Sequence, residues 1–154
     1  MSTLNFQSTK ITVIGMGYVG LPLAIEFGKK WQTVGFDIDE TRINELNDRN
    51  DITGEVTAND FIEAKHIQYT FNTDEIIDSN IYIVTVPTPI TQDNLPDLNA
   101  IKSATKLISS VISDGDIVIY ESTVYPGLTE EFCIPMLEND NFKINKDFYC
   151  GYSP

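Results

Sequence analysis

Three glycines near the amino terminus have the type and spacing of a phosphate-binding loop. Gly15, Gly17 and Gly20 form a G-x-G-x-x-G pattern between the β-branched segment 10–14 and the segment 21–30, which has helical periodicity. Taken alone, this pattern also occurs in ordinary turns. Between a strand and a helix it predicts a dinucleotide pyrophosphate site, because glycines allow a tight turn and the helix start offers free N–H groups.

An acidic residue completes this pattern. Asp37 follows a second strand-like segment, 33–36, and lies about 20 residues beyond the glycines, as dinucleotide-binding folds require. A carboxylate at this position accepts the hydroxyls of the adenosine ribose and repels a 2′-phosphate. The sequence therefore predicts that NAD, and not NADP, is the cofactor.

Two further loops place threonines among prolines at the ends of expected strands. Thr88 lies between two prolines after the segment 81–86, and Thr123 follows the segment 117–120 and precedes Pro126, which is expected in the first turn of a helix. Either loop alone could be a rigid connector, because proline fixes the backbone. Since both lie at the carboxyl ends of strands, where open α/β sheets bind ligands, we predict that both threonines contact a ligand.

Alternating strands and helices must position these residues. Strands are expected at 11–14, 33–36, 67–71, 81–86, 117–120 and 148–151, and helices at 20–30, 40–48, 59–64, 98–112 and 128–137. Val19, Leu23 and Phe27 are expected to face the sheet, and Asp97 is expected to cap the fourth helix. The predicted fold is α/β, a doubly wound parallel Rossmann sheet of about six strands in a single domain.

Composition limits the classes of function. The 154 residues carry a net charge of −13 that is spread along the chain, whereas nucleic-acid binding relies on clustered Lys and Arg. No apolar run approaches the roughly 20 residues that cross a bilayer. With a polar lead-in over residues 1–9 that lacks a signal-peptide core, we expect a cytoplasmic protein without nucleic-acid or membrane partners.

Cysteine and histidine, the usual ligands of zinc sites, are few. Cys133 and Cys150 are the only cysteines and His66 is the only histidine, and their spacing matches no metal motif. We therefore predict no metal site. Both cysteines are expected to be packed free thiols in a reducing compartment.

The motifs together resemble the UDP-glucose/GDP-mannose dehydrogenase family. The resemblance covers residues 10–154 and rests on four segments in the family's order, 15–22, 36–39, 86–89 and 122–127. Met16, the Leu21-Pro22 pair, the segment 51–56 and the long loop 89–98 are most similar to the bacterial UDP-N-acetylhexosamine 6-dehydrogenases of polysaccharide synthesis, which act on UDP-N-acetylglucosamine or UDP-N-acetylgalactosamine. This implies oxidation of the sugar C6 alcohol to a carboxylate with two NAD, without release of the aldehyde.

The resemblance also implies site residues. It assigns cofactor contacts to Gly15, Gly17, Tyr18, Val19, Gly20, Asp37, Arg42, Thr88 and Thr123. Backbone N–H groups of Tyr18 and Val19 would meet the pyrophosphate, and Arg42 would lie near the adenosine ribose or its phosphate. Thr88 and Thr123 would line the nicotinamide. Thr123 is the one catalytic residue implied, because it would also position the catalytic water.

The family's nucleophilic cysteine belongs to a later, substrate-binding half, and a catalytic glutamate of the family follows directly after the Ser-Pro pair at residues 153–154. Neither Cys133 nor Cys150 matches that cysteine motif. We therefore expect residues 10–154 to form a cofactor domain that binds NAD weakly and does not oxidise a UDP-sugar alone. The parent enzyme is expected to be a homodimer.

Three alternatives stay open. The sugar could be that of UDP-glucose or GDP-mannose, because the sugar contacts lie mostly outside this chain. A β-hydroxyacid dehydrogenase shares the fold and glycine loop but lacks the two proline-framed loops. A non-catalytic NAD-sensing module is the alternative from another class.

Overall fold

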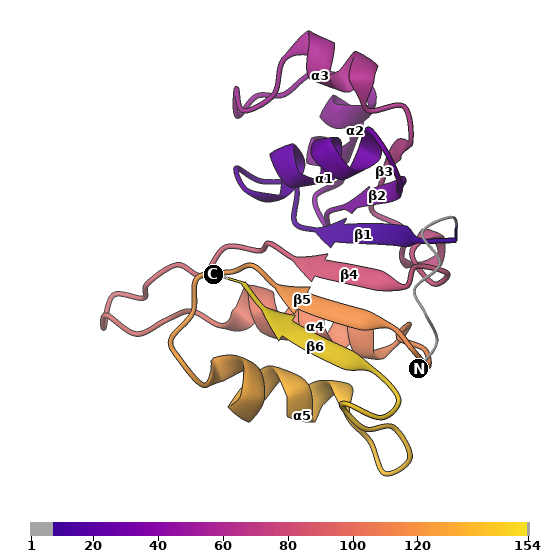
Figure 1. The fold of residues 1–154 in the computed structure, drawn as a ribbon. Coiled ribbons are helices and arrows are strands. Elements are labelled where there is room, and N and C mark those ends of the chain that lie inside the picture. Colours follow the sequence, from indigo (N-terminus) through magenta and orange to yellow (C-terminus); the bar gives the residue numbers. More distant parts are fainter. Residues whose placement is uncertain (1–7, 154) are drawn as a thin grey trace.

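A single parallel sheet forms the centre of the computed structural model, which describes residues 8–153 (Figure 1). Its strand order is β3-β2-β1-β4-β5-β6, the predicted doubly wound Rossmann topology. The strands are β1 (Lys10–Ile14), β2 (Gln32–Phe36), β3 (Ile67–Thr70), β4 (Ile81–Val84), β5 (Ile117–Tyr120) and β6 (Tyr149–Tyr152). Most of the predicted lead-in over residues 1–9 lies outside the described residues.

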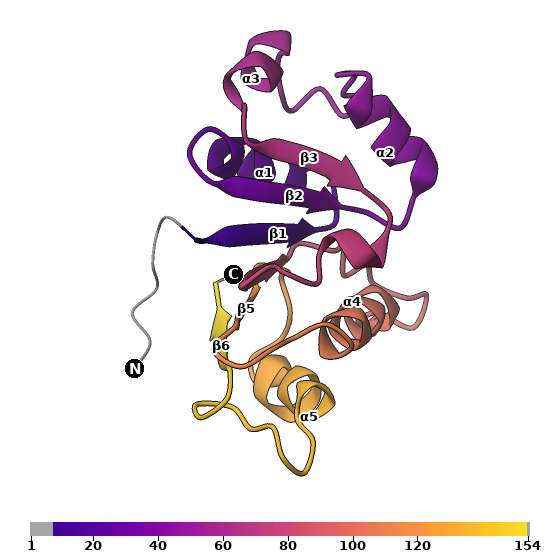
Figure 2. The ribbon, with the colours of Figure 1, turned by 90° about the vertical axis from the view of Figure 1, so that its right-hand side faces the viewer.

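Helices cover both faces of this sheet (Figures 1 and 2). One apolar core holds residues of α1 (Gly20–Gly28), α2 (Glu40–Asn47) and α3 (Ala58–Glu63), and the other holds residues of α4 (Asn99–Ser109), the π-helical η2 (Thr129–Cys133) and α5 (Ile134–Leu137). The short η1 (Thr73–Glu75) precedes β4. Val13 belongs to the first core and Ile14 to the second, because successive strand residues face opposite sides. No helix among residues 8–153 has the length and apolar content that crossing a membrane requires.

The buried face of α1 differs from the predicted one. The pattern predicts that Val19, Leu23 and Phe27 face the sheet, but Val19 is 56% exposed and the other two are only half-buried. The buried residues of α1 are Gly20, Leu21, Ala24, Ile25 and Gly28. A Cβ on Gly28 would lie 2.8 Å from Cβ of Ile67, so the helix packs closely through its glycines. Compared with the predicted orientation, α1 is therefore rotated about its own axis. Val19, its N-cap, lies exposed at the carboxyl edge of the sheet.

The positions predicted for Asp97 and Pro126 at two helix starts are wrong by one or two residues, although the expected helical range 128–137 is confirmed. Leu98 is the N-cap of α4, and Asp97 Oδ1 instead accepts the N–H of the first helical residue at 2.9 Å. Pro126 lies in a turn before the helical segment 128–137. Within that segment Pro135 has no N–H to donate, and the wider π-helical turn precedes it.

Candidate functional site

The glycine loop lies where the strand order reverses. β1 and β4 are neighbours that end in register, with Ile14 opposite Val84. The glycine loop follows β1 and the segment 85–89 follows β4, so both leave the sheet at its carboxyl edge (Figure 1). The Thr85 hydroxyl joins them, since Oγ1 lies 2.9 Å from the carbonyl oxygens of both Ile14 and Gly15. Open α/β sheets bind their ligands at such a reversal.

The three glycines have different surroundings. Gly15 has a φ of +100°, a backbone conformation that residues with a side chain rarely adopt. A Cβ on Gly20 would lie 1.7 Å from the Gly15 carbonyl oxygen. A Cβ on Gly17 would meet nothing within 4 Å. The loop is therefore packed against the protein at Gly20 and open at Gly17, where a ligand could approach the backbone.

Free backbone donors line this open side. Val19 is the N-cap of α1 and provides no side-chain cap. Within residues 8–153, no acceptor is found for the N–H groups of Gly17, Tyr18 and Val19. These donors and the positive end of the helix dipole fit a pyrophosphate. The structure thus brings the predicted glycines, Tyr18 and Val19 to one surface of free backbone donors, which is a candidate anion-binding surface.

Asp37 lies directly after β2, beside the glycine loop. Its Oδ2 accepts the Met16 N–H at 2.7 Å, and its Oδ1 accepts the Asp39 N–H at 3.0 Å. A carboxylate has about four lone-pair positions, so both oxygens keep capacity to accept a ribose hydroxyl. The distance between loop and acid is therefore set by a direct hydrogen bond.

Arg42 lies within the domain, with its residue only 8% exposed. Its Nε donates to the Met16 carbonyl at 2.9 Å, and its Nη2 donates to Asp51 Oδ1 at 2.8 Å. Its Nη1 lies 3.7 Å from Glu45 Oε2 and has no hydrogen-bond partner among the described residues. Arg42 thus supports the glycine loop, and its contact with a ribose stays a prediction.

Asp51 is a residue whose importance the sequence did not indicate. Its carboxylate is 1% exposed and accepts hydrogen bonds from Arg42, from the N–H and hydroxyl of Thr53, and from the N–H groups of Glu55 and Val56. Burial opposes ionisation of this carboxyl, but the hydrogen bonds outweigh it and lower the pKa to about 2. The segment 51–56 contributed to the family resemblance, but nothing in it pointed to a contact of Asp51 with Arg42.

The two proline-framed loops meet at the same edge of the sheet. Thr88 Oγ1 donates to the Thr123 carbonyl at 2.6 Å, and Ser122 Oγ donates to the Val86 carbonyl at 2.7 Å. Thr123 is exposed, and its hydroxyl has no hydrogen-bond partner in the described part of the chain. The structure therefore brings the two predicted threonines together and leaves the Thr123 hydroxyl available to a ligand. Ser122 and Thr85 are the loop-joining residues that the sequence did not single out.

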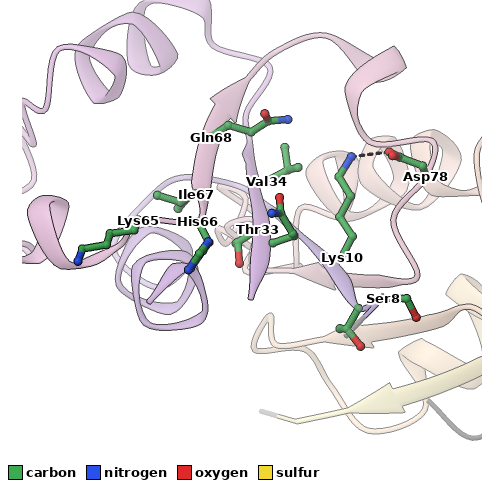
Figure 3. A pocket seen from close by; sticks show the side chains of 11 residues that line it. Ser8, Lys10, Thr33, Val34, Lys65, His66, Ile67, Gln68 and Asp78 are labelled. Carbon is green, nitrogen blue, oxygen red and sulfur yellow. Dashed lines mark hydrogen bonds and ion pairs between the residues drawn. The ribbon is translucent and has the colours of Figure 1, made fainter. Parts of the chain in front are cut away.

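A hollow of about 480 Å³ lies at the opposite edge, by the amino-terminal ends of β1, β2 and β3 (Figure 3). Lys10, Lys65 and His66 contribute basic groups to it. Lys10 Nζ is already paired with Asp78 and donates to the Glu75 carbonyl at 3.0 Å. Because dinucleotides bind beyond the carboxyl ends of strands, this hollow is not the candidate cofactor site.

The two cysteines pack in the core on the α4–α5 face. Cys133 is buried and Cys150 is half-buried, and neither forms a disulfide. Burial raises the pKa of both thiols, that of Cys150 to about 12. Both are free thiols packed in the core, as predicted. No group of His, Cys, Asp and Glu between residues 8 and 153 has the arrangement of a metal site.

Comparison with known families agrees with this geometry. Residues 9–154 match the model of the UDP-glucose/GDP-mannose dehydrogenase family, NAD binding domain. The chain belongs to this family. The resemblance of its motifs is thereby confirmed, and so is NAD as the cofactor of the domain.

Two curated members of the family are UDP-N-acetyl-D-glucosamine 6-dehydrogenases. That of Pseudomonas aeruginosa is 53% identical over 149 residues, and that of Salmonella typhi is 49% identical over 151 residues. These matches cover 96% and 97% of this chain but only 35% and 36% of the relatives. The solved structure of a UDP-D-ManNAc dehydrogenase from Pyrococcus horikoshii is similar with a TM-score of 0.86 at 32% identity, over 94% of this chain and 35% of that one. The chain thus spans about a third of its relatives' length.

Proposed function

We propose that this chain is the NAD-binding domain of a UDP-N-acetylhexosamine 6-dehydrogenase. The observation that carries the proposal is the grouping of three features at one sheet edge: the open glycine loop, Asp37, and the joined loops of Thr88 and Thr123. The sugar class is proposed from the relatives that are 53% and 49% identical.

Each group at this edge has a role that its chemistry supports. The N–H groups of Tyr18 and Val19 would hold the pyrophosphate, and Asp37 would accept the ribose hydroxyls. Bound NAD would accept the hydride that leaves the sugar C6. Thr88 and Thr123 would line the nicotinamide, and the exposed Thr123 hydroxyl would orient a water without adding charge beside the hydride path.

For the whole protein, we propose a cytoplasmic homodimer that oxidises the C6 alcohol of a UDP-N-acetylhexosamine to the uronate with two NAD, in polysaccharide precursor synthesis. UDP-glucose and GDP-mannose are the alternative substrates. A reducing compartment fits the two free thiols.

Calorimetric titration with NAD tests the domain's role. We expect the 154-residue chain to bind NAD and Asp37→Asn to weaken binding roughly tenfold, because the ribose loses a charged acceptor. Asp74→Asn is the matched control, since that carboxylate is exposed at η1. The complete protein, assayed with UDP-N-acetylglucosamine, UDP-glucose and GDP-mannose, should form NADH fastest with the first. Absence of NAD binding by the unaltered chain would overturn the proposal.

A further inference from the structure

A buried arginine lies on the side of the site that would face adenosine. Arg42 holds the carbonyl of Met16, and Asp37 holds the N–H of the same residue. The guanidinium and the carboxylate are therefore separated by the backbone of one residue. In this fold, an arginine near the acid after the second strand is the group that accommodates the 2′-phosphate of NADP.

Arg42 does not present its charge to that position. Its side chain is 9% exposed, and its Nη2 donates to Asp51 Oδ1 at 2.8 Å. Asp51 is itself fixed by Thr53, Glu55 and Val56, so the acceptor cannot follow Arg42 outward without losing those hydrogen bonds. The cation is thus paired and directed into the domain.

Asp51 is the carboxylate that decides this orientation. Glu45 is the other acid beside Arg42, but its Oε2 lies 3.7 Å from Nη1, beyond hydrogen-bond distance. Among the described residues Arg42 Nη1, Glu45 Oε2 and the Tyr69 hydroxyl are all buried without a hydrogen-bond partner. Only Asp51 therefore holds the guanidinium by a direct charged hydrogen bond.

We propose that Asp51 determines the cofactor specificity of this domain by retaining Arg42 inside it. The Arg42 charge then stays paired with Asp51 and does not offset the charge of Asp37, so a 2′-hydroxyl is accepted and a 2′-phosphate is repelled. Asp51 is a positioning residue, because it acts through Arg42 and not on the cofactor itself. The inference rests on the proposed function, namely that this edge binds NAD.

Asp51→Asn tests the inference by removing the negative charge while keeping the size of the side chain. The freed Arg42 charge should strengthen NADP binding, while NAD binding stays equal or weakens. We expect the ratio of the NADP to the NAD dissociation constant, measured by calorimetry, to fall roughly tenfold. A merely structural role for Asp51 would weaken both cofactors alike and leave the ratio unchanged.

A second variant guards against misfolding. The amide nitrogen of Asn would face the N–H groups of Glu55 and Val56, whereas Asp51→Ser keeps an oxygen acceptor and introduces no opposed amide. The same fall in the ratio is expected for it. Thermal unfolding of each variant reports whether the fold is kept.

Two further variants identify the cause. In the double variant Arg42→Gln/Asp51→Asn, the gain in NADP affinity should disappear, because no cation is left to take the phosphate. Asp60→Asn is the matched control: its carboxylate caps α3 through Thr57 and makes no contact with Arg42. It should leave the ratio unchanged.

The outcomes separate the two proposals. A chain that binds no NAD refutes the proposed function. A chain that binds NAD, but whose Asp51→Asn and Asp51→Ser variants keep the original ratio, refutes the role of Asp51. A gain in NADP affinity that persists in the double variant also refutes it.

Discussion

Gly17 and Gly20 belong to one loop but constrain it differently. A Cβ on Gly17 has no protein atom within 4 Å, whereas a Cβ on Gly20 would lie 1.7 Å from the Gly15 carbonyl oxygen and 2.4 Å from Thr85 Oγ1. We predict that Gly17→Ala keeps stability within about 0.5 kcal/mol but weakens NAD binding roughly tenfold. Gly20→Ala should destabilise the fold by about 3 kcal/mol or more, since backbone must move. Thermal unfolding and NAD titration of both variants check this, and equal effects of the two would contradict it.

Thr88 and Thr123 share one hydrogen bond but contribute different groups to it. Thr88 gives its hydroxyl and Thr123 its backbone carbonyl. Thr88→Val should therefore cost about 0.5–1.5 kcal/mol of unfolding free energy, measured in urea. Thr123→Val keeps the carbonyl, so stability should be unchanged, while turnover by the complete protein should fall because the exposed hydroxyl is lost. Loss of stability in Thr123→Val would show that its side chain has a structural partner.

The sequence could predict the location of those candidate site residues whose position follows from the backbone topology alone. Asp37 is one, because the end of β2 must lie beside the loop that follows β1 in this topology. The burial of Arg42 was not predictable in the same way. It depends on how the loop after α2 folds back to place Asp51, a contact that strand and helix patterns do not specify.

At the scale of elements, runs of apolar and β-branched residues located the six strands to within about two residues, which is the usual uncertainty of element ends. The orientation of α1 was less predictable. Periodicity counts apolar residues, whereas Gly28 packs against Ile67 of β3 and Gly20 packs against Gly15 and Thr85, and neither glycine contributes hydrophobicity. The π-helical turn before Pro135 likewise depends on the backbone, because Pro135 has no N–H to donate to the preceding turn. The periodicity of apolar side chains does not detect this.

The turn that leads into β5 contains an acid whose burial should make stability depend on pH. Asp116 is 5% exposed and its Oδ2 accepts the Ser113 N–H at 2.7 Å. Burial, with a smaller contribution from Asp114, raises the pKa of Asp116 from 3.8 to about 6. Between these two values the folded chain holds a proton that the unfolded chain has lost. Stability from this group therefore falls as pH rises from about 4 to about 6.

Asp116→Asn should relieve this cost. We predict a gain of about 1–2 kcal/mol in unfolding free energy near pH 7.5 and little gain near pH 4. The Asn oxygen can still accept the Ser113 N–H. Urea unfolding at both pH values is the measurement. Asp93→Asn changes the net charge equally from an exposed position that does not contribute to the Asp116 pKa, so a similar gain there would attribute the effect to overall charge.

At the scale of the whole molecule, the candidate site is assembled from both halves of the sheet. The glycine loop, Asp37 and Arg42 come from the β1–β3 half, whereas Thr85, Thr88 and Thr123 come from the β4–β6 half. The pairing of β1 with β4 and the Thr85 hydroxyl hold the halves together at the site. The site therefore requires the complete sheet and cannot be divided between its halves.

This domain should supply cofactor binding without catalysis. The resemblance assigns the nucleophile to a cysteine that neither Cys133 nor Cys150 matches, and burial raises the pKa of both described thiols within the core. We predict that the 154-residue chain forms no NADH from UDP-N-acetylglucosamine above background while binding NAD. The Pseudomonas aeruginosa relative is the positive control, and Cys133→Ser and Cys150→Ser should bind NAD within about twofold of the unaltered chain. NADH formation proportional to chain concentration, and lost in either Ser variant, would instead identify a catalytic thiol within this domain.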